Sequence, residues 1–198
     1  MSELREILGE TVTRLFADRC TKDLLEKCDG GVWPAELWAV VEENGLTRPL
    51  LTEDKGGVDA GWQAVYVILY AAGRFAAPIP LAETILAGWL LDQAGMEIPD
   101  GVLSIVPDSE DISISGEMIS GGAINVPWAR RADYLVGICG GDGGVSRCAI
   151  SALSEVCGDT NGKSCDVKSG NRIHSVYKVQ HCLPWISIID GKFRFESG

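Results

Sequence analysis

Cysteine and histidine are the residues in this sequence best suited to bind a metal or act as nucleophiles. The chain has seven cysteines and two histidines, His174 and His181. No two cysteines form a CxxC pair, and the spacing between cysteines and histidines matches no common zinc site. An odd number of cysteines without a signal peptide favours free thiols. We therefore expect no metal site, with one alternative left open: a metal-binding module built on the five carboxy-terminal cysteines (Cys139, Cys148, Cys157, Cys165 and Cys182).

Glycine-rich segments and a pair of arginines are the second group of residues that could bind a ligand. The run from Gly140 to Gly144 lacks the Lys-Ser/Thr pair and the opening helix of a phosphate loop, so we expect a hairpin there. Gly56-Gly57 predicts a loop between two helices. Arg130-Arg131 suits either a ligand phosphate or a solvated surface. Spacing alone gives no Ser-His-Asp arrangement, because such triads are set by geometry.

Charge narrows the possible partners. The net charge is −11, from 28 acidic and 17 basic residues. This excess of acid argues against nucleic acid, which is bound largely by Lys and Arg, and against an anionic membrane surface. The longest apolar run, residues 65–72, is far shorter than the roughly 20 residues of a membrane span. The amino terminus does not resemble a signal peptide, so we expect a cytoplasmic protein.

Helical patterns fill the first 95 residues. Apolar residues recur at helical spacing, and prolines, glycines and a candidate cap at Thr21 mark the ends. The prolines of residues 77–80 keep that segment extended, which predicts a stiff elbow. We expect helices at residues 4–16, 21–28, 34–44, 60–75 and 81–94.

Short β-like runs separated by glycines replace the helical pattern after residue 100. One of them, residues 112–115, alternates as a half-buried strand does. The fold class expected is α+β, with an all-helical domain at residues 1–97 and an antiparallel β domain at residues 98–198. The tail of the β domain, after about residue 151, matches no pattern that we recognise. The expected strands lie at residues 102–106, 112–115, 123–126, 134–138, 145–150, 173–179, 185–189 and 193–195.

The two helices expected at residues 60–75 and 81–94 are apolar on almost every side. A helix of this kind must be buried on every side. Since five apolar residues of the first helix (Val65, Val67, Ile68, Leu69 and Ala72) cannot all face one small core, we expect these helices to cover a helical bundle absent from this sequence or a partner that replaces it, with Val67 and Leu69 as contact positions. A glutamate at either position should then disrupt association, because an unpaired buried charge is costly.

Four segments, in order, resemble the amino-terminal region of the acyl-CoA dehydrogenases. They are WAVVEENGL at residues 38–46, LTEDKGG at residues 51–57, AGRFAAPIPL at residues 72–81, and VPWA at residues 126–129 followed by Ala-Asp-Tyr at residues 132–134. Each segment alone is only a weak indication of the family, but the occurrence of all four in the same order is a stronger one. The resemblance covers about residues 4–138.

This resemblance implies FAD as cofactor and an acyl-CoA thioester as substrate, in lipid metabolism. In such enzymes a carboxylate removes the α-proton while the β-hydride passes to the flavin, which supplies the redox chemistry. The middle β domain holds one side of the flavin. Matched residue by residue, this places five cofactor-binding residues in the present chain: Val126, Pro127, Trp128, Arg130 and Arg131.

Two departures from the family pattern limit this expectation. The family continues into a carboxy-terminal four-helix bundle with the catalytic glutamate, and no such helices follow here, so no catalytic residue is assigned. Pro127 stands where many members offer the flavin an N–H and a hydroxyl, and proline offers neither. We therefore expect a flavoprotein chain that is incomplete, or that acts as a homo-oligomer or with a partner subunit supplying the bundle, and that is inactive alone. The alternative is a non-catalytic interaction protein that keeps the fold without the flavin.

Overall fold

The computed structural model describes residues 3–106, 113–115, 118–120, 123–124, 126–140, 146–152, 164–165, 175–178, 186–189 and 192–195. The chain divides into two compact units, Met1–Trp89 and Leu90–Gly198. The division falls within the last helix, before the boundary at residue 97 that composition predicts. A domain boundary at residues 97/98 stays a prediction.

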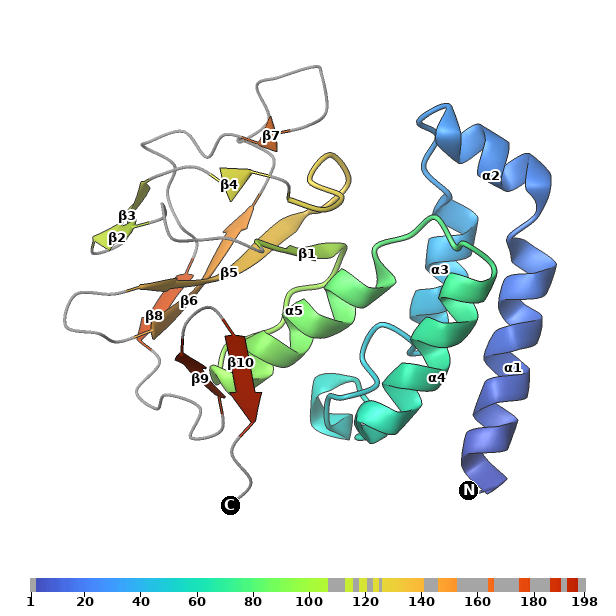
Figure 1. The fold of residues 1–198 in the computed structure, drawn as a ribbon, viewed down its shortest axis with the longest axis horizontal. Helices are drawn as coiled ribbons and strands as arrows, with labels where there is room; N and C mark the ends of the chain where they lie inside the picture. The colour runs from blue at the N-terminus through green and yellow to red at the C-terminus, as the bar shows by residue number, and fades with distance from the viewer. Residues whose placement is uncertain are drawn as a thin grey trace. The chain divides into compact units, whose positions relative to one another are not determined.

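The five helices expected from the sequence are confirmed (Figure 1). The helix expected at residues 34–44 begins one residue later, because Pro34 has a non-helical backbone (ψ 63°) and occupies the N-cap position. A short 3-10 helix, Glu53–Lys55, precedes the fourth helix. The helices are α1 (Glu3–Arg19), α2 (Lys22–Asp29), α3 (Ala35–Glu43), α4 (Gly61–Arg74) and α5 (Leu81–Gln93).

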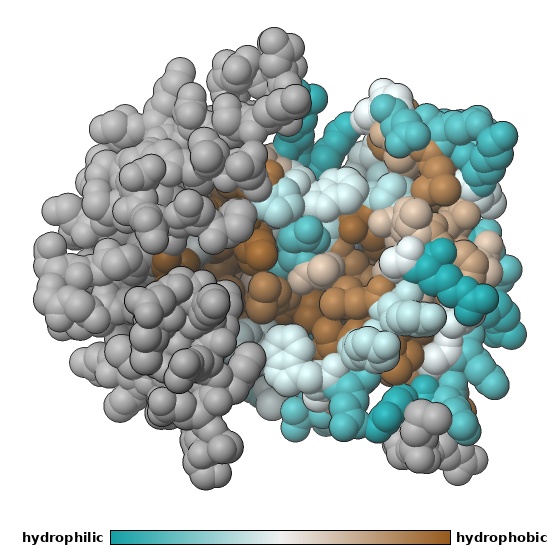
Figure 2. Space-filling view, in the orientation of Figure 1, coloured by the Kyte–Doolittle hydropathy of each residue, from teal (hydrophilic) through white to brown (hydrophobic). Residues whose placement is uncertain are grey.

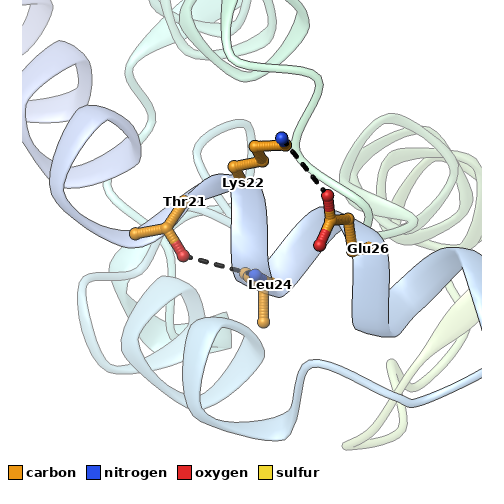
Figure 3. A network of polar contacts seen from close by, with 4 residues as sticks. All are labelled: Thr21, Lys22, Leu24 and Glu26. Atoms are coloured by element: carbon orange, nitrogen blue, oxygen red, sulfur yellow. Dashed lines mark hydrogen bonds and ion pairs between the residues drawn. The ribbon is translucent and has the colours of Figure 1, made fainter.

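Helix α2 shows how local chemistry sets a boundary (Figure 3). The Thr21 hydroxyl accepts a hydrogen bond from the backbone N–H of Leu24 at 3.3 Å, which satisfies one donor of the first turn. Lys22 lies 3.5 Å from Glu26, one turn along the helix. This pair is largely exposed and contributes little. The cap, predicted from the sequence, is the feature that fixes where the helix begins.

The core of the helical unit lies between α1 and α4, which run side by side (Figure 1). Val12 and Phe16 of α1 are fully buried, and Ile68 of α4 is 1% exposed. Gly9 of α1 faces Val67 of α4, and a Cβ atom at Gly9 would lie 3.5 Å from the Val67 side chain, at ordinary van der Waals distance. Val67 is therefore half-buried against α1 within its own unit.

Gly57, in the Gly56-Gly57 turn, packs against the backbone of the preceding loop residues Arg48 and Leu51. A Cβ atom on Gly57 would lie 2.1 Å from the Leu51 carbonyl oxygen and 2.5 Å from that of Arg48. Asp59 then donates its backbone N–H to the Leu51 oxygen at 2.8 Å. The glycine pair is explained by this close backbone approach, in agreement with the loop that the sequence predicts.

A four-stranded sheet forms the centre of the second unit, in the order β1-β5-β6-β8. Strand β1 (Leu103–Ile105) pairs in parallel with β5 (Tyr134–Gly140), and Leu103 aligns with Tyr134. Strands β6 (Ser146–Ala152) and β8 (Ser175–Lys178) continue the sheet antiparallel. The α+β class is confirmed, but the prediction of an antiparallel domain is wrong for the β1–β5 pair. Parallel strands cannot be joined by a tight hairpin and require a long connection, and a long connection joins β1 to β5.

The other described strands form antiparallel pairs of two. They are β2 (Ser113–Ser115) with β3 (Met118–Ser120), β4 (Ala123–Ile124) with β7 (Ser164–Cys165), and β9 (Ile186–Ile189) with β10 (Lys192–Phe195). The sequence pattern does not predict β3 or β7. Figure 2 shows apolar side chains reaching one face of the described part of the molecule, bordered by hydrophilic ones. Among the helices in that part, none has the length and apolar content needed to cross a bilayer.

Candidate functional site

The five residues predicted to bind a cofactor lie in one turn, residues 126–132, just before β5. Val126, Pro127 and Trp128 are half-buried, whereas Arg130 and Arg131 are exposed. The turn therefore presents an apolar surface next to two guanidinium groups.

Trp128 gives this turn an unusual backbone. Its φ angle is +55°, in the left-handed region that bulky residues rarely occupy. Two backbone N–H groups then converge on its carbonyl oxygen, from Arg131 at 2.8 Å and from Ala132 at 3.0 Å. Such a conformation costs on the order of 1–3 kcal/mol and persists only where neighbouring structure enforces it. Backbone outliers of this kind cluster at functional sites, which makes Trp128 the most informative residue of the turn.

Strand β1 supplies the structure that enforces the turn. The Ser104 hydroxyl is fully buried and donates a hydrogen bond of 2.5 Å to the Pro127 carbonyl oxygen. After the turn, the Asp133 carboxylate accepts the backbone N–H of Val102 at 2.8 Å, and the Asp133 N–H donates to the Val102 oxygen at 2.8 Å. Hydrogen bonds thus hold the turn on both sides of Trp128, to Ser104 of β1 and to Val102 just before that strand.

Gly101 makes room for the second of these anchors. Its φ angle is +115°, and a Cβ atom there would lie 2.6 Å from the Asp133 carboxylate. Ser104 and Asp133 are the residues of the site that sequence reasoning missed. Asp133 belongs to the Ala-Asp-Tyr segment of the family resemblance and Ser104 to no motif, but the bonds that both residues form are invisible in the sequence, because the partners lie 31 and 23 residues away along the chain.

The remaining sequence candidates fall largely outside the described residues. Gly141 to Gly144, both histidines and the side chains of the five carboxy-terminal cysteines lie there. Within the described residues, no group of three or more His, Cys, Asp or Glu side chains could hold a metal ion. The metal-binding alternative is thus neither supported nor tested by that part of the chain.

Cys20, which precedes α2, and Cys28, which lies in its last turn, are free thiols. Burial raises the pKa of Cys20, and the neighbouring Cys28 raises it further. Burial, followed by the charge of Asp29, also raises the pKa of Cys28. A raised pKa lowers the thiolate fraction, so neither cysteine has the character of a reactive nucleophile.

Comparison of the fold with solved structures gives a consistent result. One subunit of the ChsE4-ChsE5 complex from Mycobacterium tuberculosis superposes with a TM-score of 0.74 at 18% sequence identity, over 90% of this chain and 57% of that one. The Tcur3481-Tcur3483 steroid ACAD G363A variant gives a TM-score of 0.69 at 20% identity, over 86% and 55% of the two chains. An acyl-CoA dehydrogenase complexed with FAD from Bacillus anthracis gives a TM-score of 0.67 at 12% identity, over 89% and 38%.

These superpositions cover little more than half of the first two solved chains, so this chain spans only part of their length. No protein-family model and no curated protein matches the sequence. At these identities the likeness concerns the fold. The resemblance seen in the sequence is thereby confirmed at the level of structure: this chain has a partial acyl-CoA dehydrogenase fold.

Proposed function

We propose that this chain belongs to an acyl-CoA dehydrogenase-like flavoprotein that oxidises the Cα–Cβ bond of an acyl-CoA thioester. The fold likeness supports this proposal, because one of the similar solved chains is an acyl-CoA dehydrogenase complexed with FAD. The observation that carries it is the left-handed Trp128, held by β1 in the segment where the family resemblance places the flavin. FAD, when bound, would accept the hydride that leaves Cβ.

The turn has surfaces that fit such a cofactor. Val126 and Trp128 are half-buried and offer apolar contact to a planar ring, which an aromatic side chain can stack against. The exposed Arg130 and Arg131 can each form a charge-assisted bond to a phosphate oxygen. Ser104 acts as a positioning residue, because it fixes the Pro127 carbonyl and hence the direction of Trp128.

A second chain is part of the proposal. No catalytic base can be assigned among the residues of this sequence, and the chain spans little more than half of its first two structural relatives. One of those relatives is a subunit of the ChsE4-ChsE5 complex. We infer that a homo-oligomeric copy or a partner subunit supplies the helical bundle of the family to this chain, in the cytoplasm.

The second candidate function is a non-catalytic interaction protein. Pro127 favours it, since a proline at this point gives the flavin no N–H. Loss of flavin chemistry with retention of the fold would also explain why no base is assigned. Flavin binding separates the two candidates.

The test is a flavin fluorescence titration of the full chain, alone and with candidate partner chains. We expect weak FAD binding to the parent. Trp128→Ala should weaken it about tenfold, equivalent to about 1.4 kcal/mol. Trp62→Ala, at an exposed position on α4, is the matched control and should leave the affinity unchanged. Tight binding that Trp128→Ala does not change would refute the placement of the site, and no binding under any condition would favour the non-catalytic candidate.

Activity gives an independent check of the need for a partner. Without a positioned base the chain loses a general-base contribution of about 10²–10⁴-fold. We expect no turnover of any acyl-CoA by the isolated chain with an artificial electron acceptor. Turnover would show that a base exists within this sequence.

A further inference from the structure

The end of α3 contains an Asn-Gly pair that the proposed function does not use. Asn44 is exposed and is the C-cap of the helix, with φ −85° and ψ 6°. Gly45 follows in the left-handed region, with a φ angle of +67°. A Cβ atom on Gly45 would meet no atom within 4 Å, so the glycine is needed for its backbone conformation and not for a close contact.

Gly45 and Leu46 close α3 with the two hydrogen bonds of a Schellman motif. The N–H of Gly45 donates to the Glu42 oxygen at 2.8 Å, and the N–H of Leu46 donates to the Val41 oxygen at 3.1 Å. Leu46 is 6% exposed, so its side chain anchors the motif in the core. Backbone bonds and one buried side chain therefore hold this end of the helix together.

An Asn-Gly pair can undergo a reaction of its own, the spontaneous loss of the side-chain amide. The glycine nitrogen attacks the asparagine Cγ atom, so that a new N–Cγ bond closes a five-membered succinimide ring. The Cγ–Nδ2 bond breaks, and the proton of the glycine N–H leaves with Nδ2 as ammonia. Water then opens the ring to aspartate or isoaspartate, without any oxidant or reductant. Glycine favours the reaction because it has no side chain to shield the attacking nitrogen.

The cap of α3 holds each participant away from this reaction. A ψ angle of 6° at Asn44 places the Gly45 nitrogen beside the backbone nitrogen of Asn44, whereas ring closure needs it beside the Cβ atom. The Gly45 N–H is bound to the Glu42 oxygen. The Asn44 Nδ2 donates to the Val40 oxygen at 2.7 Å, one turn back along the helix. Ring closure therefore requires the end of α3 to open.

We propose that Asn44 is a site of spontaneous deamidation whose rate is set by local opening of the α3 cap. The product does not restore the cap. A carboxylate at residue 44 has no N–H for the Val40 oxygen and adds negative charge at a helix C-terminus, where the dipole is already negative. Isoaspartate also lengthens the backbone between the helix and Gly45. This proposal is independent of the flavin site, which lies in the other unit.

The first test follows deamidation of the full chain by peptide mass mapping, in buffer and in urea that unfolds the chain, at the same pH. The second Asn-Gly pair of the sequence, Asn161-Gly162, is measured in the same samples, and its rate in urea gives the reactivity of an uncapped pair. Asn44 should react at least about tenfold more slowly in buffer than in urea, because several hydrogen bonds must break first. Equal rates at Asn44 in buffer and in urea, or no reaction there in urea, overturn the proposal.

The second test separates opening of the cap from unfolding of the whole chain. Leu46→Ala removes the buried anchor and leaves Asn44-Gly45 intact, so it should raise the rate in buffer at least about fivefold. Leu37→Ala, at a buried position of α3 outside the Schellman motif, is the matched control. It should leave the rate within about twofold of the parent. Equal acceleration by both variants overturns the proposal.

A measurement on the parent chain keeps the second test decisive if either variant fails to fold by circular dichroism. The rate at Asn44 is then measured at increasing urea below the unfolding transition. Local opening exposes little surface, so the rate should stay nearly constant over this range. A rate that rises in proportion to the unfolded fraction overturns the proposal.

Discussion

At the scale of the residue, Gly57 shows how one missing side chain fixes a loop. The backbone of Leu51 and Arg48 occupies the place that a Cβ atom would need. Gly57→Ala should therefore cost about 1–3 kcal/mol in the free energy of unfolding, as overpacking does. The measurement is a urea denaturation curve.

Gly73→Ala is the matched control. Gly73 lies exposed in α4 with open space around it, so alanine should stabilise the chain by about 0.5–1 kcal/mol through its better helix propensity. If both variants shift the curve in the same direction, the close approach at Gly57 is not the controlling factor.

Asp54 provides a pH-dependent prediction at the same scale. A hydrogen bond from the Thr52 side chain lowers the pKa of Asp54 below its ordinary value of 3.8, and its own backbone N–H and Lys55 lower it further. A lowered pKa means that the interaction stabilises the fold above pH 3.8 and is lost as the pH falls through the lower, folded value. Thr52→Val should move the pKa of Asp54 upward in a carboxyl NMR titration, while Thr52→Ser should keep it low. An unchanged value in Thr52→Val would show that another group lowers it.

At the scale of the element, the turn before β5 combines strain with anchoring. Both Trp128→Gly and Trp128→Ala remove the indole ring, but only glycine accepts a φ angle of +55° freely. The glycine variant should therefore be more stable than the alanine variant by about 1 kcal/mol. The measurement is the melting temperature of each variant. An alanine variant as stable as the glycine variant, or more stable, would contradict the left-handed conformation of residue 128.

Elements set by local chemistry can be predicted from the sequence, and elements set by distant contacts cannot. The Thr21 cap and the glycine stop after α3 define helix ends within a few residues, so the predicted positions of α2 and α3 are confirmed. The parallel β1–β5 pair depends on residues about 30 positions apart, and no local pattern specifies it. The same limit applies to the site: the sequence singles out residues 126–131 as one segment, whereas Ser104 becomes visible only in the fold.

The outward face of α4 marks another limit of sequence reasoning. Residues 65–72 contain almost no polar group, which predicts a helix that is buried all round. Tyrosine and tryptophan count as apolar in such a pattern but tolerate water at their polar atoms. The structure shows three of them in one exposed line, which composition alone does not separate from a core.

At the scale of the whole molecule, the excess of acidic over basic residues predicts how stability responds to salt. Lys22–Glu26 and Lys27–Asp23 are two ion pairs among the described residues, each one turn apart on α2 and exposed. Such pairs are worth little, whereas a net charge of −11 opposes the compact state. Added NaCl, about 0.5 M, should screen the repulsion and raise the melting temperature. KCl should act equally, and a melting temperature that falls in both salts would show that specific ion pairs dominate.

Parallel pairing of β1 with β5 also fixes an order of events in folding. Strand β1 lies at the edge of its sheet, with β5 as its neighbour. During synthesis, β1 emerges well before its neighbour and must wait with the backbone of residues 103–105 unpaired. Local helices form quickly, whereas long-range strand pairs must first overcome the entropy of closing their loop. The nascent chain therefore carries an open strand edge for the time that ribosomes need to add the connection, and during this interval the edge is exposed to aggregation and to chaperones.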